Sequence, residues 1–180
     1  MTAYVNHRAH VIVGVGDTCL SNVRELIATA EEARVDGILL IIPYFNIYSE
    51  EMVEAYYDEV VASTSLPILI YNFPDLTGFD CQTELVRRLA LKHENIVGIK
   101  ETVSDTEHIR TMLTIKKSKP DFMVFAAYEN HVLATLPFGI DGFINATANF
   151  APEFTVNTWQ SFHHGDMDAT VKSAKKMTEA

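Results

Sequence analysis

The chain has 180 residues, 48% of them hydrophobic, and a formal net charge of −10 at pH 7. This length suits a single domain with one core. The negative charge argues against a nucleic-acid partner or an anionic membrane surface, because both require a basic patch. Small-molecule chemistry and protein contacts remain as classes of function.

The cysteines and the apolar runs argue against export, metal binding and membrane insertion. Cys19 and Cys81 lie far apart without metal-ligand spacing, and the amino end carries no signal-peptide pattern. The longest apolar run, around Ile38 to Pro43, is far shorter than the roughly 20 residues of a membrane helix. We therefore expect a reduced, cytoplasmic protein with no membrane span, no metal and no cofactor.

In chain order, the sequence alternates predicted strands with predicted helices. After Tyr4 to Arg8, which resembles a last helical turn, β-branched apolar runs predict strands at 11–15, 38–42, 67–71, 96–100, 122–126 and 142–146. Helical spacing and start signals predict helices at 21–34, 49–62, 82–91, 104–117 and 129–136, and another beginning at Pro152. The 104–117 helix begins with a capping box from Ser104 to Glu107. Strand starts recur at roughly 26 to 29 residues for most of the chain, which is typical of parallel strand-helix-strand units.

Two parallel α/β architectures fit these elements. A closed barrel needs eight strands and typically about 250 residues, so this chain would be two strands short. A doubly wound open sheet needs no more strands. Gly14-Val15-Gly16 supplies two of the three glycines of a dinucleotide-binding turn, which is weak support for a nucleotide-binding domain.

Lys100 ends the apolar run Ile96 to Ile99, where lysine is unexpected. At the carboxyl end of a buried parallel strand, a desolvated amine can attack a carbonyl and form a Schiff base. The structural alternative is an ion pair with a carboxylate such as Glu101. The other lysines compared with Lys100 fall in charged helical or turn stretches: Lys92, Lys116, Lys117, Lys119, Lys172, Lys175 and Lys176.

Two motifs then carry a family resemblance. The motif Tyr71-Asn72-Phe73-Pro74 is followed about 29 residues later by the motif Gly98-Ile99-Lys100-Glu101-Thr102. This distance matches the strand-helix repeat of the chain. With these the chain resembles the dihydrodipicolinate synthase and N-acetylneuraminate lyase superfamily of pyruvate-dependent aldolases, from about Val11 to Pro152. The supporting stretches are Val13 to Gly16, Pro43 to Asn46, Leu66 to Leu69, Leu76 to Gly78, Asp141 to Ile144 and Thr147 to Asn149.

The resemblance implies a TIM barrel with a Schiff-base site. Lys100 would condense with the keto group of pyruvate or another 2-oxo acid, and Tyr71 on the preceding strand would relay protons. The resemblance also implies substrate-binding positions at Tyr44, Thr77 and Ile144. The expected partners are pyruvate and an aldehyde, and the full-length family member is expected to be a homo-oligomer.

Two positions depart from the family's synthases. Leu76 stands where lysine-biosynthetic synthases have an arginine that holds a substrate carboxylate. Phe45 stands where they have a proton-relaying tyrosine, and phenylalanine has no proton to pass. The resemblance is therefore greater to the aldolases that cleave 2-keto-3-deoxy sugar acids.

The resemblance also predicts a partial barrel. No glycine- and hydroxyl-rich carboxylate-binding loop is present, so residues 1–180 are expected to form one partial TIM-barrel domain with strands three to eight. The first two strands and most of the carboxyl-terminal helical extension would be missing, which would expose two strand edges and apolar core. Three functions remain open: a sugar-acid aldolase, a dihydrodipicolinate synthase in the full-length protein, and an inactive fragment or barrel-completing subunit.

Smaller candidates have ordinary structural explanations. His163 and His164 with Asp166 and Asp168 are better explained as a solvated helix end than as a metal site. The stretch Glu129 to His131, together with Thr147 and Asn149, is predicted either to line the substrate mouth or to serve in turns.

Overall fold

A parallel sheet of six strands forms the centre of the computed structural model, which describes residues 2–179. The strands are β1 (Ile12–Val15), β2 (Gly37–Ile41), β3 (Ile68–Asn72), β4 (Ile96–Glu101), β5 (Met123–Ala126) and β6 (Gly142–Phe143). They pair in their chain order, each parallel to the next. A doubly wound sheet reverses its strand order at a switch point, so that alternative is wrong.

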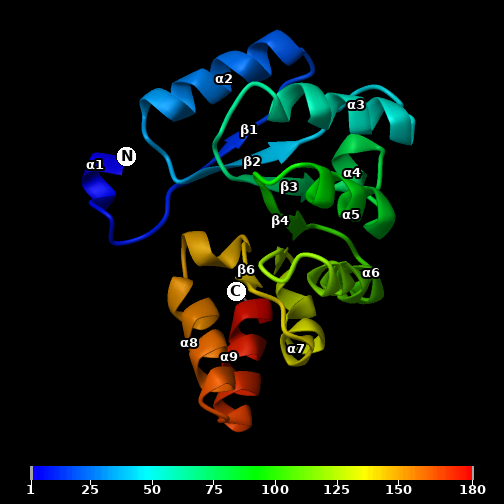
Figure 1. The fold of residues 1–180 in the computed structure, drawn as a ribbon. Coiled ribbons are helices and arrows are strands. Elements are labelled where there is room, and N and C mark those ends of the chain that lie inside the picture. The colour runs from blue at the N-terminus through cyan, green and yellow to red at the C-terminus, as the bar shows by residue number, and fades with distance from the viewer. Residues whose placement is uncertain (1, 180) are drawn as a thin grey trace.

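Helices lie between successive strands and cover the outer face of the sheet (Figure 1). They are α2 (Leu20–Glu32), α3 (Glu50–Val61), α4 (Pro74–Thr77), α5 (Thr83–Lys92), α6 (Thr106–Met112) and α7 (Val132–Thr135). Helix α1 (Thr2–Val5) precedes β1, and α8 (Pro152–His163) and α9 (Met167–Glu179) follow β6. Helices α8 and α9 pack side by side at the end of the molecule away from α2. None of the helices in residues 2–179 has the length and apolar character that a membrane crossing requires.

The core lies between the sheet and the helices. Helix α2 buries Val23, Ile27 and Ala30, which recur at helical spacing and form one face of the helix. The strands contribute fully buried side chains such as Ile38 and Ile70. Burying a side chain of this size stabilises the fold by roughly 1.5–3 kcal/mol.

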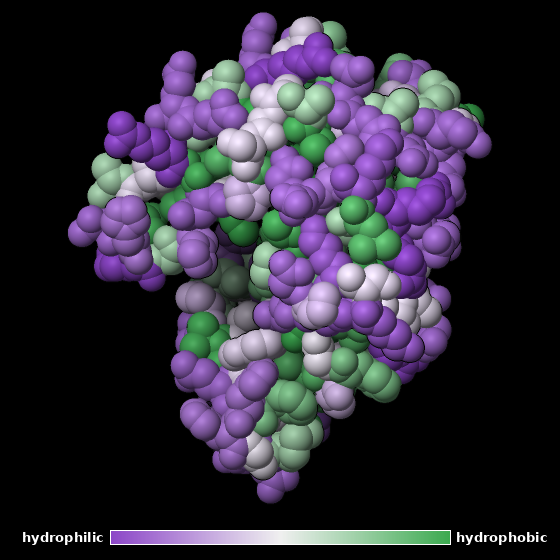
Figure 2. Space-filling view, in the orientation of Figure 1, coloured by the Kyte–Doolittle hydropathy of each residue, from purple (hydrophilic) through white to green (hydrophobic). Residues whose placement is uncertain are grey.

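The sheet curves as a partial TIM barrel and stays open between β1 and β6. Within residues 2–179 each of these strands pairs on one side only. An apolar hollow of about 350 Å³ opens on the inner face, lined among others by Leu69 and Phe125, and Ile12 on β1 is 44% exposed. Figure 2 shows hydrophobic residues in a hollow between the part that carries α2 and the part that carries α8 and α9. The predicted partial barrel is confirmed.

The start of α6 differs from the predicted one. The capping residue is Asp105, whose Oδ1 accepts a 2.8 Å hydrogen bond from the amide of Glu107. A capping box based on Ser104 is therefore wrong. The helix also ends at Met112 and continues as a 3-10 turn over Leu113–Lys117.

Two later elements are shorter than predicted. The 129–136 segment divides into a 3-10 turn at Glu129–His131 and α7, and a second 3-10 turn at Leu136–Phe138 contains Pro137, which lacks an amide donor. Strand β6 stops at Phe143 instead of residue 146, because its partner β5 ends at Ala126. Only the amide of Ile144 extends the pairing, at 3.0 Å from the Ala126 carbonyl oxygen.

Candidate active site

Lys100 and Tyr71 are cross-strand neighbours at the carboxyl ends of β4 and β3. Paired residues of adjacent strands point to the same face of a sheet. The Lys100 Nζ accordingly lies 4.1 Å from the centre of the Tyr71 ring. Within residues 2–179 no carboxylate lies at ion-pair distance from Lys100, and Glu101 bonds elsewhere, so the ion-pair explanation for this lysine is wrong.

The two side chains open into a hollow of about 390 Å³. The hollow is lined by the carboxyl ends of β3, β4 and β5 and by the segment after β6. Barrel enzymes hold their substrates at this edge of the sheet. Its lining residues are Tyr71, Phe73, Lys100, Thr102, Ala127, Tyr128, Glu129, Ile144, Asn145, Ala146 and Asn149.

The structure brings only some of the predicted site residues together. Ile144 lies in the hollow with Lys100 and Tyr71. Thr77 is buried in α4, with its Oγ1 3.1 Å from the carbonyl oxygens of Phe73 and Phe79, and it does not line the hollow. Tyr44 is 41% exposed and also lies outside it. The roles of all five predicted residues stay predictions.

Thr102 is a site residue that the sequence analysis missed. It follows Lys100 by two positions, the spacing that keeps side chains on one face of a strand. Thr102 lines the hollow, and its Oγ1 is buried with no hydrogen-bond partner among residues 2–179. A buried, unpaired hydroxyl costs free energy, so a partner for this atom would be favourable.

Glu129, in the segment after β5, binds Thr147, in the segment after β6. Its Oε1 accepts hydrogen bonds from the amide of Thr147 at 2.9 Å and from the Thr147 Oγ1 at 2.7 Å. Burial opposes the charged carboxylate, but the bonds from Thr147 outweigh it and lower the pKa of Glu129. Thr147 therefore supports the lining from behind, while Glu129 and Asn149 form part of it.

On the opposite face of the sheet, a polar cluster lies behind the two candidate catalytic residues. Asn72 donates through Nδ2 to Glu101 Oε2 and to Asp80 Oδ1, both at 2.9 Å. The Nε2 of His108 on α6 lies 3.5 Å from Glu101 Oε1 and 3.6 Å from Asp80 Oδ1. Glu101 is fully buried.

Burial and charge shift the pKa values in this cluster. Burial raises the pKa of the Glu101 carboxyl, although His108 and Asn72 favour its charged form. Burial disfavours the imidazolium of His108, but the nearby carboxylate of Glu101, with the charges of Asp80 and Asp105, outweighs it and raises the pKa of His108. The raised pKa means that the folded protein binds this proton more tightly than the unfolded chain.

We expect the free energy of unfolding to fall as the pH rises from about 6.5 through the raised pKa of His108. The contribution of His108 is complete below the ordinary histidine pKa of about 6.5 and is lost as the pH passes through the raised folded value. Urea unfolding at several pH values should show this slope, reduced in His108→Gln and retained in His164→Gln, an exposed histidine. An unchanged slope in His108→Gln would contradict the assignment.

The histidines near the carboxyl end occupy a different environment. His163 and His164 are exposed at the end of α8, and His163 Nδ1 lies 2.9 Å from the Trp159 carbonyl oxygen. Across residues 2–179, no three His, Cys, Asp or Glu side chains gather closely enough to hold a metal ion.

The comparisons with known proteins agree with this geometry. The family model of the dihydrodipicolinate synthetase family matches residues 1–179. A probable 2-dehydro-3-deoxy-D-pentonate aldolase of Escherichia coli K12, YjhH, is 41% identical over 176 residues, which are 97% of this chain and 58% of that protein. The crystal structure of YagE, a prophage protein of E. coli K12 belonging to the dihydrodipicolinic acid synthase family, in complex with pyruvate, superposes with a TM-score of 0.93 at 38% identity and covers 97% of this chain and 59% of that one.

A dihydrodipicolinate synthase from Thermotoga maritima also matches, with a TM-score of 0.91 at 29% identity over 98% of this chain and 60% of that one. The chain thus spans about three fifths of the length of the relatives it matches. It belongs to the dihydrodipicolinate synthetase family.

Proposed function

We propose that this chain carries the Schiff-base site of a lyase that makes or breaks a carbon–carbon bond between pyruvate and an aldehyde. The observation that carries the proposal is the Lys100 amine at 4.1 Å from the Tyr71 ring, in a hollow that Thr102 also lines. The aldolase name of YjhH and the pyruvate in the YagE crystal structure support the same chemistry.

Each residue has a defined part in the proposed reaction. The neutral amine of Lys100 attacks the C2 carbonyl of the 2-oxo acid, and the Tyr71 phenol gives its proton to the departing oxygen, so that loss of water leaves an iminium and a Tyr71 phenolate. When the bond between C3 and C4 breaks, its electron pair moves toward the iminium nitrogen and the proton of the C4 hydroxyl passes to the phenolate oxygen. Tyr71 then gives that proton to C3, and hydrolysis of the iminium by water releases pyruvate and free Lys100 and returns a proton to Tyr71.

The site favours a hydroxylated 2-oxo acid over the substrate of a synthase. Thr102 Oγ1 would pair with a substrate hydroxyl, which would satisfy its unmet hydrogen bond. Leu76 has no charge with which to hold a second carboxylate. We therefore propose a 2-keto-3-deoxy sugar acid as the substrate class. A cytoplasmic location and a homo-oligomeric state stay predictions.

Trapping with sodium borohydride tests the proposal. The purified chain, incubated with pyruvate and reductant, should gain one pyruvate adduct, and peptide mapping should locate it at Lys100. The Lys100→Met variant should gain none. The Lys116→Gln variant should react like the wild type, because Lys116 pairs with Asp141 away from the hollow. A folded wild type without an adduct would favour an inactive fragment or a barrel-completing subunit.

A further inference from the structure

The cluster of Asn72, Asp80, Glu101 and His108, called here the outer cluster, lies directly behind the proposed site. Asn72 follows Tyr71 on β3, and Glu101 follows Lys100 on β4. Successive strand residues point to opposite faces, so the outer cluster contacts the helices while Lys100 and Tyr71 face the hollow. Asn72 and Glu101 are themselves cross-strand partners, one step beyond the pair formed by Tyr71 and Lys100.

The register of these two strands is not uniform. Ile68 pairs with Ile96, but Leu69 pairs with Gly98, so Val97 is passed over. Residues beyond this shift therefore need contacts of their own to hold the alignment. Two such contacts are present: the amide of Thr102 donates to the Asn72 carbonyl oxygen at 2.9 Å, and the Asn72 side chain donates to Glu101 at 2.9 Å.

If Glu101 only filled space in the core, its burial would cost free energy that an apolar residue would not. A fully buried carboxylate carries a desolvation penalty of several kcal/mol, and among residues 2–179 its Oε1 has no hydrogen bond, only the charge contact with His108 Nε2 at 3.5 Å. An apolar side chain of similar volume would fill the same space without that penalty. What an apolar residue would not provide is the acceptor for Asn72.

We propose that the outer cluster is a positioning device that fixes the register of β3 and β4 and thereby holds the Lys100 amine against the Tyr71 ring. Glu101 and Asn72 are positioning residues in this scheme and do not touch the substrate. His108 and Asp80 hold the outer ends of the two side chains. The effect of the outer cluster on the position of Lys100 does not depend on the proposed function. Only its effect on imine formation rests on that function.

The first test reads the position of Lys100 by NMR. Protons on the Lys100 ε-carbon, close to the face of the Tyr71 ring, should resonate upfield of those of other lysines, and a Lys100→Arg variant assigns the signal. The Glu101→Leu variant should lose this shift while remaining folded. Asn72→Ala, which removes the contact from the β3 side, should lose it as well. Glu101→Gln keeps an acceptor for Asn72 and should retain most of it.

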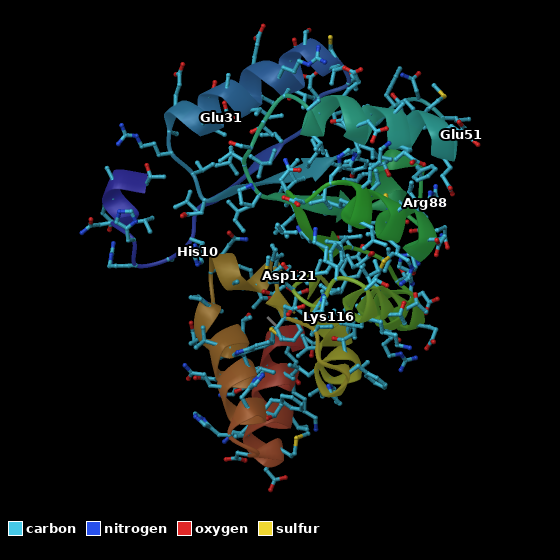
Figure 3. All side chains as sticks on the ribbon, viewed as in Figure 1. His10, Glu31, Glu51, Arg88, Lys116 and Asp121 are labelled. Carbon is cyan, nitrogen blue, oxygen red and sulfur yellow. The ribbon has the colours of Figure 1, made fainter. Side chains whose placement is uncertain are left out.

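Lys116→Gln is the matched control. Lys116, labelled in Figure 3, forms a half-buried ion pair with Asp141 at 2.7 Å, so its loss removes a comparable polar contact elsewhere. This variant should keep the upfield Lys100 signal. A Glu101→Leu protein that keeps the wild-type shift would overturn the proposal.

The second test measures the rate of borohydride trapping at saturating pyruvate. Misplacement of a reacting group by a fraction of an ångström to 1 Å slows a reaction by about tenfold to a hundredfold, so Glu101→Leu should trap about tenfold more slowly. Glu101→Gln should be close to the wild type. If the wild type itself forms no adduct, the proposed function fails while the NMR result still decides the positioning role. A wild-type trapping rate in Glu101→Leu would count against that role.

Discussion

The Tyr71→Phe variant should cleave a 2-keto-3-deoxy sugar acid about 10²- to 10⁴-fold more slowly than the wild type, the usual contribution of a general acid–base group. The substitution removes only the phenolic oxygen. The ring that lies 4.1 Å from Lys100 Nζ remains, and so does the tilted contact with Phe73 at 5.8 Å between ring centres. Pyruvate release measured over time gives the rate.

A second phenol in the same hollow provides the comparison. Tyr128 follows β5 and lines the hollow, but it comes from a different strand end than Tyr71. Tyr128→Phe should slow pyruvate release by less than about tenfold, since a contact that only binds substrate is worth less than proton transfer. Equal losses in the two variants would remove the specific role proposed for Tyr71. Both variants should still form the borohydride adduct at Lys100.

The pairing of Lys100 with Tyr71 was predictable because its signals are local. Each residue ends an apolar run, and parallel strands joined by helices bring their carboxyl ends to one edge of the sheet. The two-residue repeat of a strand also predicts Thr102 on the face of Lys100. The same alternation predicts Glu101 on the opposite face, away from Lys100.

The remaining differences depend on tertiary contacts. Asn145 enters the lining because its Nδ2 lies 3.2 Å from Thr155 Oγ1 and 3.0 Å from Met177 Sδ, on two helices that follow later in the chain. His108 joins the outer cluster because the packing of α6 brings its side chain next to Glu101. Ser104 and Asp105 are both good capping residues, and the path of the loop after β4 decides between them. No periodicity in the sequence contains this information.

Gly98→Ala is expected to destabilise the fold by about 3 kcal/mol, the upper end of the usual cost of overpacking. A Cβ at residue 98 would lie 2.5 Å from the Met123 carbonyl oxygen and 2.8 Å from Leu69 Cδ2. The leucine can rotate away, but the carbonyl belongs to the neighbouring strand and moves only if β5 moves. Gly98 lies on the same face as Lys100, two residues before it. The close approach of β5 at Gly98 therefore also determines where the Lys100 side chain leaves the sheet.

Gly14→Ala is the matched control, because it also lies in a strand and a Cβ there meets no atom within 4 Å. It should be neutral or more stable by about 0.4–1 kcal/mol, since alanine restricts the unfolded chain. Urea unfolding of both variants measures the difference. If Gly98→Ala were as stable as Gly14→Ala, strand β5 would be free to shift, and close packing at Gly98 would not determine where the Lys100 side chain leaves the sheet.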